Sequence, residues 1–258
     1  MPKKRLIYTL LYDEGYFVQS RNFRRQRVGD LGWLADIYGF SNIAQSVDEL
    51  VLLNVSTNAD WNGRFIEACS KIAERFFAPI AVGGGIRTLS QARQAIEIGA
   101  EKVVVNSMLD WENVSVLEEI AATYGRQAVV GSIDLKRDSA GGYGAYVGGG
   151  RQLASRSAAQ HVARASKLSI GELMIGSIDQ DGTGMGLDLA TLDLVPETTG
   201  LPIVLCGGAG NQSHLFAALE HPRVDGVATA NLLNFVGDGL ARARQWLREE
   251  NRVDLAHW

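Results

Sequence analysis

Cysteine, proline and long apolar runs are scarce in this sequence. Its 258 residues include two cysteines, Cys69 and Cys206, and five prolines. Two cysteines exclude a framework of several disulfides and are typical of a reducing compartment. No run of 18 apolar residues is present, and no leader with a charged start and an apolar core is recognisable. We therefore expect a cytoplasmic protein without a membrane partner.

An excess of charge of either sign is also absent. Lysine and arginine total 25 and aspartate and glutamate total 29, which gives a formal net charge of −4. This balance gives no reason to expect nucleic acid as a partner, so any bound anion must be held by local groups. The four histidines, His161, His214, His221 and His257, show no metal-ligand spacing. We expect no metal and no cofactor.

Glycine, by contrast, is abundant, with 29 residues. Short apolar runs recur, each followed by small polar residues and glycine, a pattern typical of strands covered on both faces in a parallel sheet. Strands are expected over residues 6–11, 50–54, 80–83, 103–106, 128–133, 173–177, 203–205 and 226–229. Amphipathic segments predict helices over residues 61–76, 89–98, 114–124, 155–168, 213–219 and 237–249.

These alternating elements predict an α/β fold. Eight strand–helix units in about 250 residues have the size of a closed (βα)8 TIM barrel, with a doubly wound open sheet as the alternative. No linker or break in composition is visible, so residues 1–258 are expected to form a single barrel domain.

An internal repeat predicts that the barrel consists of two similar halves. The segment PIAVGGGIRTLSQA, which begins at Pro79, resembles PIVLCGGAGNQSHL, which begins 123 positions later at Pro202. At the same offset, DELVLLNV from Asp48 matches GELMIGSI from Gly171. A half-barrel repeat places equivalent features on opposite sides of the barrel axis.

Glycine clusters follow the third and the seventh predicted strands, at the end of a barrel where ligands bind. They comprise Gly83, Gly84 and Gly85 in one half and Gly207, Gly208 and Gly210 in the other. Small polar residues close the fourth and eighth strands, namely Asn106, Ser107, Thr229, Ala230 and Asn231. Glycine lets backbone N–H groups converge on an oxyanion at a helix start, so each half is expected to hold one phosphate. Tight turns without a ligand are the alternative.

Acidic side chains end the fifth and sixth strands. Asp134 is the first candidate for a general acid or base, because desolvation at a strand end moves the pKa of a carboxyl toward neutrality. A salt bridge from Asp134 to Lys136 or Arg137 is the alternative. Asp179 and Asp181 end the sixth strand, and Asp181 is equally suited to shaping its loop.

The repeat exposes an asymmetry at the first strand. The position equivalent to Asp134 is Leu11, so an apolar side chain is expected where symmetry allows a second carboxylate. Asp13 and Glu14 lie just beyond, but side chains alternate in direction along a strand, so neither is a secure substitute.

Charged residues begin four of the predicted strands, at the opposite end of the barrel. They are Arg5, Glu49, Lys102 and Glu172. Taken singly, such residues are usually solvated. Together, two cations and two anions are able to form a neutral ring of ion pairs that closes the barrel and gates a small molecule entering along its axis.

Two further features are weaker candidates. Cys206 is interpreted as a small core residue, because no histidine is paired with it by motif. The glycine-rich segment Gly141–Gly150 predicts a flexible hairpin that covers the site as a lid.

Four motifs carry a resemblance to a known family. They are VGGGI from Val82, SIDLKR from Ser132, SIDQDGT from Ser177 and GGAG from Gly207. In this order they closely resemble the cyclase subunit of imidazole glycerol phosphate synthase, over essentially the whole chain. Members of that family are (βα)8 barrels that pair with a separate glutaminase subunit. Ammonia travels through the barrel to a bisphosphorylated ribonucleotide, which is converted to imidazole glycerol phosphate and an aminoimidazole carboxamide ribotide.

The resemblance implies a role for each matching position. Arg5, Glu49, Lys102 and Glu172 would be the ammonia gate. Gly85, Asn106 and Ser107 would hold one phosphate, and Asp181, Gly182, Gly208, Ala230 and Asn231 the other. Asp134 matches one of two catalytic aspartates. The sequence has no recognisable glutaminase arrangement, so a class I amidotransferase-like partner in a heterodimer is implied.

Departures from the family pattern concentrate at the reacting end. The second catalytic aspartate falls on Leu11, and the lysine that follows it falls on Gln19. Asn231 stands where a serine is usual, and Asn54 replaces an aspartate. Leucine cannot transfer a proton, and loss of one of two acid–base groups costs about 10²–10⁴ in rate. Impaired cyclase activity is therefore expected, although the gate and the phosphate glycines are intact.

This pattern favours a second group of similar proteins. They work with a glutaminase-like subunit and a sugar amidotransferase to make amidino sugars for surface polysaccharides such as lipopolysaccharide. A genuine cyclase of histidine biosynthesis is the alternative, followed by a non-catalytic activator or scaffold of the glutaminase. A stand-alone phosphosugar isomerase is disfavoured, because it has no use for a channel.

Overall fold

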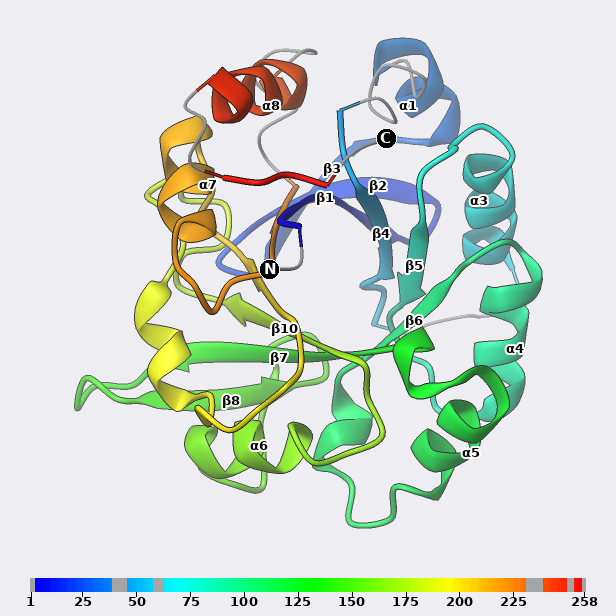
Figure 1. The fold of residues 1–258 in the computed structure, drawn as a ribbon. Helices are drawn as coiled ribbons and strands as arrows, with labels where there is room; N and C mark the ends of the chain where they lie inside the picture. Colours follow the sequence, from blue (N-terminus) through cyan, green and yellow to red (C-terminus); the bar gives the residue numbers. More distant parts are fainter. Residues whose placement is uncertain (1–2, 39–45, 58–62, 231–238, 250–252, 257–258) are drawn as a thin grey trace.

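The computed structural model describes residues 3–38, 46–57, 63–230, 239–249 and 253–256. Eight parallel strands form a closed ring, and helices surround it (Figure 1). Around the ring the order is β1, β4, β5, β6, β7, β10, β11 and β12; β12 pairs with β1, and β7 pairs with β10. The predicted (βα)8 barrel is therefore confirmed, and the open sheet is excluded because no strand of the ring has a free edge.

Every barrel strand overlaps one of the predicted apolar runs. The strands are β1 (Arg5–Asp13), β4 (Glu49–Asn54), β5 (Ile80–Gly83), β6 (Lys102–Val105), β7 (Val129–Arg137), β10 (Glu172–Ser177), β11 (Ile203–Cys206) and β12 (Gly226–Thr229). Their burial explains the continuous apolar pattern, because helices cover one face and the barrel interior covers the other.

The predicted helices are also present, and their bounds differ from those of the amphipathic segments by a few residues at most. They are α3 (Arg64–Ala73), α4 (Leu89–Glu97), α5 (Ser115–Tyr124), α6 (Ala158–Ala165), α7 (Gln212–Leu219) and α8 (Gly239–Glu249). Helix α1 (Leu31–Tyr38) was not predicted. Between β10 and β11 the chain forms a 3-10 helix, η3 (Leu189–Leu194), which ends just before Pro196; shorter 3-10 turns are η1 (Ser107–Asp110) and η2 (Arg126–Ala128).

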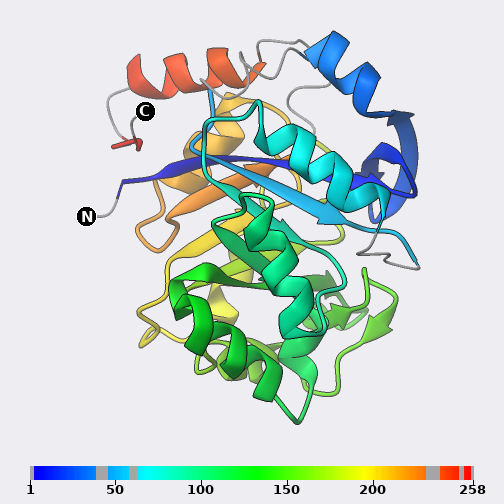
Figure 2. The same ribbon diagram turned by 90° about the vertical axis from the view of Figure 1, so that its right-hand side faces the viewer.

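Two hairpins extend the barrel at the carboxyl ends of its strands. Strands β2 (Tyr16–Arg21) and β3 (Arg24–Gly29) follow β1, and β8 (Tyr143–Val147) and β9 (Gln152–Leu153) follow β7. Strand β1 begins at one end of the barrel, and the blue β2–β3 hairpin lies at the other (Figure 2). The first hairpin was missed because β3 is almost uniformly polar and shows no apolar alternation.

The barrel interior contains one apolar layer to which every barrel strand contributes a side chain. Its members are Ile7, Val51, Ala81, Val104, Val130, Met174, Val204 and Ala228. Leu53 and Cys206 pack against this layer from the side of the strand ends. A separate and larger core lies between the strands and the surrounding helices. The layer shows which side chains near the strand ends face the barrel interior. Side chains two or four residues away from a layer residue on the same strand point to the same side as that residue.

Candidate functional site

Four charged residues lie at the barrel end where the strands begin. Arg5, Glu49, Lys102 and Glu172 each precede by two positions the interior-layer residue of the same strand. Lys102 Nζ lies 2.8 Å from Glu49 Oε2 and 2.9 Å from Glu172 Oε2. Arg5 Nη1 lies 3.0 Å from Glu49 Oε2, and Arg5 Nη2 pairs with Glu172 Oε1. The four side chains therefore form the closed ring of ion pairs that the strand register allows.

The two carboxylates of this ring differ in their surroundings although both are buried. Burial raises the pKa of Glu49, and its contacts with Lys102 and Arg5 offset this only in part. Burial acts in the same direction on Glu172, but hydrogen bonds from Arg5 and Lys102 hold the pKa of Glu172 below its ordinary value. The ring therefore contains one firmly ionised carboxylate and one that is more easily protonated.

Asp134 and Leu11 lie at the opposite end of the barrel. Each follows the interior-layer residue of its strand by four positions, Val130 on β7 and Ile7 on β1. In the ring of eight strands, β1 and β7 are separated by three strands on either side, so the two residues occupy opposite walls. Leu11 is partly buried and pairs with Val18 of β2. The wall facing Asp134 is therefore apolar at this level.

Asp134 lies in a desolvated environment and makes no ion pair within the described residues. Burial raises the pKa of Asp134 to about 7, and the nearby Asp181 adds to the shift. One hydrogen bond opposes it, from Asn106 Nδ2 to Asp134 Oδ2 at 3.1 Å. The alternative of a salt bridge to Arg137 is wrong, because that guanidinium pairs with Asp188. A carboxyl with a pKa near neutrality exchanges protons readily at physiological pH, as a general acid or base requires.

Cys206 is a neighbour of Asp134 that sequence patterns did not connect with it. A Cβ atom placed on Gly176 would lie 3.2 Å from Cys206 Sγ and 3.3 Å from Asp134 Oδ1, so Gly176 provides the space between them. Burial raises the pKa of the Cys206 thiol, and the nearby carboxylates of Asp134 and Asp181 raise it further. The thiol therefore stays protonated and is unsuited to act as a nucleophile.

The glycine loops of the two halves have the same backbone conformation. Gly84 and its repeat partner Gly207 have φ values of 91° and 89°, and Gly85 and Gly208 have 85° and 105°. A Cβ atom on Gly84 would lie 2.0 Å from Asn54 O, and one on Gly208 would lie 2.0 Å from Gly186 O. These positions therefore require glycine. Each loop leads into a helix with an equivalent cap, Thr88 for α4 and Asn211 for α7.

Two of the remaining candidates for phosphate binding, Ser107 and Ala230, lie at the same end of the barrel. Ser107 begins η1, and its Oγ accepts a hydrogen bond from the Gly148 N–H at 3.2 Å. This contact joins the strand end to the β8–β9 turn, within the segment predicted to be a lid. Ala230 directly follows β12. Asn231 lies outside the described residues.

Asp181 and Gly182 support the β2–β3 hairpin. Asp181 Oδ2 accepts hydrogen bonds from Ser20 Oγ at 2.5 Å and from the Phe23 N–H at 3.0 Å. Asn22 Nδ2 donates to the carbonyl oxygens of Ile178 and Asp179, at 3.1 and 2.7 Å. A Cβ atom on Gly182 would lie 2.1 Å from Ser20 O. The sequence did not reveal these contacts, because they join segments about 160 residues apart.

A second anchor that the sequence did not reveal holds the β7–β8 hairpin. Asp188 accepts hydrogen bonds from Arg137 Nη2 at 2.9 Å and from the Tyr143 hydroxyl at 2.8 Å. The Asp179 carboxylate accepts a hydrogen bond from the Arg137 N–H at 2.7 Å, so Asp179 contributes to this anchor.

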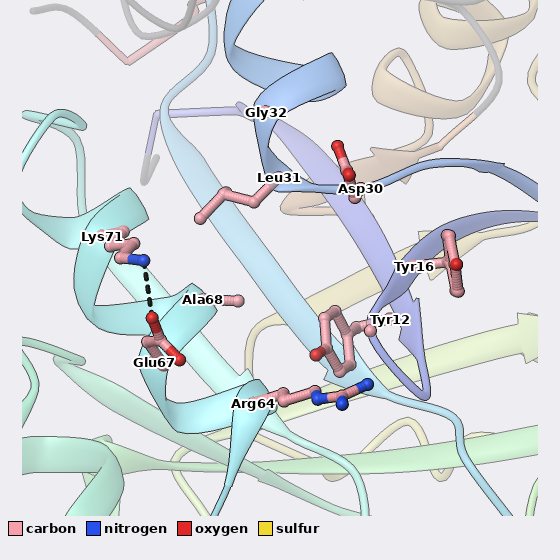
Figure 3. A pocket seen from close by; sticks show the side chains of 10 residues that line it. Tyr12, Tyr16, Asp30, Leu31, Gly32, Arg64, Glu67, Ala68 and Lys71 are labelled. Carbon is pink, nitrogen blue, oxygen red and sulfur yellow. Dashed lines mark hydrogen bonds and ion pairs between the residues drawn. The ribbon is translucent and has the colours of Figure 1, made fainter.

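A surface cavity of about 290 Å³ lies outside the barrel, between the base of the β2–β3 hairpin and helices α1 and α3. Figure 3 shows Tyr12 and Arg64 on its wall and the exposed Lys71–Glu67 ion pair at its edge. None of the predicted site residues lines it.

Two other kinds of feature are absent from the described residues. No cluster of histidine, cysteine and acidic side chains there has the arrangement of a metal site. No helix in the described ranges is long and apolar enough to cross a membrane.

A closed (βα)8 barrel with a desolvated carboxyl and paired glycine loops at the carboxyl ends of its strands belongs to the class of barrel proteins that bind ligands at that face. Residues 10–237 match the family of histidine biosynthesis proteins. The chain belongs to this family and, within it, to the HisF-type subunits of imidazole glycerol phosphate synthase.

Three relatives show the extent of the similarity. A protein of Parasynechococcus marenigrum (strain WH8102), provisionally named imidazole glycerol phosphate synthase subunit hisF2, is 39% identical over 100% of this chain and 95% of its own length. The HisF subunit of Streptococcus sanguinis (strain SK36) is 32% identical over 95% of this chain and 96% of its own length. The HisF subunit of Streptococcus gordonii (strain Challis) is 34% identical over 91% of this chain and 92% of its own length.

Proposed function

We propose that this HisF-type chain takes ammonia from a glutaminase partner at the ion-pair ring and delivers it to a phosphorylated acceptor beside Asp134. The acceptor reaction is the formation of an amidino sugar for a surface polysaccharide. The observation that carries this proposal is Leu11 on the wall opposite Asp134, where symmetry allows a second carboxylate. Ring closure that uses acid–base groups on both sides of a substrate needs a second group opposite Asp134. Leu11 at this position cannot transfer a proton.

The barrel axis supports the delivery of ammonia. The ring of Arg5, Glu49, Lys102 and Glu172 closes one end, and its charges balance. Beyond it lies the apolar layer from all eight strands. Transfer of neutral ammonia into such surroundings costs far less free energy than transfer of an ion, so the layer excludes ions much more strongly than ammonia.

The two glycine loops support an acceptor with two phosphates. They lie on opposite sides of the barrel, on β5 and β11, and their matching backbone conformations place two equivalent turns before helices α4 and α7. Asp134 lies between them at the strand ends, where a ligand spanning both loops would place its reacting atoms. A sugar amidotransferase would be a further partner in this reaction.

A genuine histidine-pathway cyclase is the second candidate, and the relatives named HisF favour it. In that case Asp134 alone, with its pKa near 7, supplies the acid–base chemistry. A non-catalytic activator of the glutaminase is the third, and it predicts that Asp134→Asn leaves every function of the complex unchanged.

The test is an assay of the complex with its glutaminase partner, supplied with glutamine and the bisphosphorylated ribonucleotide of histidine biosynthesis. We expect glutamate to form while imidazole glycerol phosphate stays at trace levels. Robust formation of imidazole glycerol phosphate would overturn the amidino-sugar proposal and establish the cyclase. Purified HisF from Streptococcus sanguinis with its own glutaminase is the matched positive control.

A further inference from the structure

The Asn106 side chain directly follows β6 and is held by two hydrogen bonds. Its Nδ2 donates to Ser132 O at 3.1 Å and to Asp134 Oδ2 at 3.1 Å. A backbone carbonyl oxygen can only accept a hydrogen bond, so the amide nitrogen, not the amide oxygen, must face Ser132. This contact determines the orientation of the whole amide group.

The other end of the same amide is buried without a partner. Asn106 Oδ1 has no hydrogen-bond donor among the described residues and is shielded from solvent. A buried acceptor left without a donor is destabilising, and such groups are rare in native structures. The Nδ2 contacts prevent the amide from turning to relieve this cost. The oxygen is therefore suited to a donor that arrives with a ligand.

The position of Asn106 indicates which ligand that is. It follows the interior-layer residue Val104 by two positions, so it lies on the interior side of β6, immediately past the apolar layer. A molecule that has crossed this layer along the axis reaches Asn106 first and then Asp134, which lies two positions further from the layer on β7 and contacts Asn106 Nδ2. Only a small neutral molecule crosses the layer readily, and the ligand must donate a hydrogen bond.

We propose that Asn106 Oδ1 receives neutral ammonia as it leaves the apolar layer, and that Asn106 is a positioning residue for ammonia beside Asp134. This inference rests on the proposed ammonia delivery. Ammonia has three N–H donors and one lone pair. A hydrogen bond from ammonia to Oδ1 uses a donor and leaves the lone pair free to react. This role concerns the Asn106 side chain and is separate from the phosphate contact that the resemblance implies for this position.

The experiment follows the Asn106 side-chain amide by NMR in the complete chain, in mildly alkaline buffer. Its resonance is assigned by its loss in Asn106→Asp. The probe is ammonium chloride, which supplies neutral ammonia at this pH, and potassium chloride at the same concentration is the control for a cation of similar size. We expect a saturable shift with ammonium chloride alone. No shift, or the same shift with potassium chloride, would overturn the inference.

Two variants separate ammonia positioning from a structural role. Asn106→Leu is expected to raise the KM for ammonia at least tenfold in nitrogen transfer while the KM for the acceptor stays unchanged. Asn54→Asp is the control at the end of β4, two strands away from β6 in the barrel, because Asn54 Oδ1 is already satisfied by the Ser56 N–H at 3.0 Å. An equal change in both KM values, or a fall in kcat alone, would show that Asn106 acts in another way.

The NMR experiment tests the ammonia site at Asn106, and the transfer assay tests the proposed function. Either proposal can therefore be rejected without the other. Transfer of glutamine nitrogen without a shift at Asn106 would reject this inference and leave the proposed function standing. A saturable shift without any nitrogen transfer would reject the proposed function and leave the ammonia site standing.

Discussion

Asp134 and Leu11 occupy equivalent positions in the two halves of the barrel but differ in chemistry. Asp134 has a pKa near 7 because burial disfavours its charged form and Asp181 lies nearby. Leu11 provides neither a proton nor a countercharge. The departure at Leu11 was visible in the sequence, because the repeat aligns it with Asp134. The hydrogen bond from Asn106 to Asp134 was not, because no motif predicts which way a side-chain amide turns.

Leu11→Asp introduces a carboxyl on the wall opposite Asp134. If only this group limits ring closure, formation of imidazole glycerol phosphate by the complex is expected to rise by about 10²–10⁴, the usual contribution of one acid–base group. Leu11→Asn is the control, since the asparagine side chain has the same shape as that of aspartate but no ionisable proton. An unchanged rate in Leu11→Asp would show that the substrate pocket differs as well.

Asp134→Asn is expected to stabilise the protein in a pH-dependent manner. The pKa of Asp134 is about 7 in the folded state and about 4 in the unfolded chain. The folded state therefore loses stability as pH rises from about 4 to about 7, and the loss stays constant above that range. The variant does not ionise, so its advantage in free energy of unfolding is expected to grow over this range.

Urea denaturation at a series of pH values measures this advantage. The same substitution at the exposed Asp193 is the control. A pH-independent difference for Asp134→Asn would contradict the desolvated environment of Asp134.

At the scale of elements, the largest difference between the structure and the sequence-based prediction is the β2–β3 hairpin. The eight barrel strands were predicted because each is a continuous apolar run. The β2–β3 hairpin was not, because its second strand is polar and it is stabilised by docking on the loop after β10. Its turn residues Asn22 and Phe23 have φ values of 51° and 62°, a conformation that asparagine tolerates better than most residues.

Asn22→Ala is expected to loosen this hairpin. The variant loses the two hydrogen bonds to Ile178 O and Asp179 O and places alanine at a positive φ. We expect a local destabilisation of about 1–2 kcal/mol. The hairpin contains exposed arginines, among them Arg24 and Arg25, so faster trypsin cleavage there measures the change.

Asn113→Ala is the matched control for this experiment. Asn113 also uses its side chain for a local contact, with the Ser115 N–H at 2.9 Å, but it lies far along the chain from the hairpin. Its cleavage pattern at residues 21–27 is expected to equal that of the wild type. Equal cleavage of both variants would show that the hairpin is held by other contacts.

At the scale of the whole molecule, the ion-pair ring links four strands around the barrel. Arg5, Glu49, Lys102 and Glu172 belong to β1, β4, β6 and β10, so their contacts bridge strands that are not all neighbours in the sheet. The ring closes one end of the axis, and the hairpins flank the other. A path from ring to Asp134 therefore runs through the apolar layer.

Lys102→Met is expected to destabilise the whole barrel. Two buried carboxylates would then share one cation, Arg5, and their mutual repulsion would no longer be balanced. Because the ring is partly accessible to solvent, we expect a loss of about 2–3 kcal/mol in the free energy of unfolding, below the value for a fully buried pair. Chemical denaturation at neutral pH measures it.

Lys71→Met is the matched control, because it removes a lysine from an exposed pair with Glu67 on α3. No measurable change in stability is expected there, since exposed pairs contribute little. Similar losses in both variants would contradict a special role of the ring.

By itself, the sequence determined the strand–helix order, the half-barrel repeat and the residues at each strand end. It did so because apolar runs, glycines and an offset of 123 positions are local or periodic signals. Only the tertiary structure decided which of these residues meet. Barrel closure brings β10 beside β7, turns Asn106 toward Asp134 and assigns Asp181 to the β2–β3 hairpin. Such contacts join distant segments whose side-chain directions depend on packing, and no single stretch of sequence encodes packing.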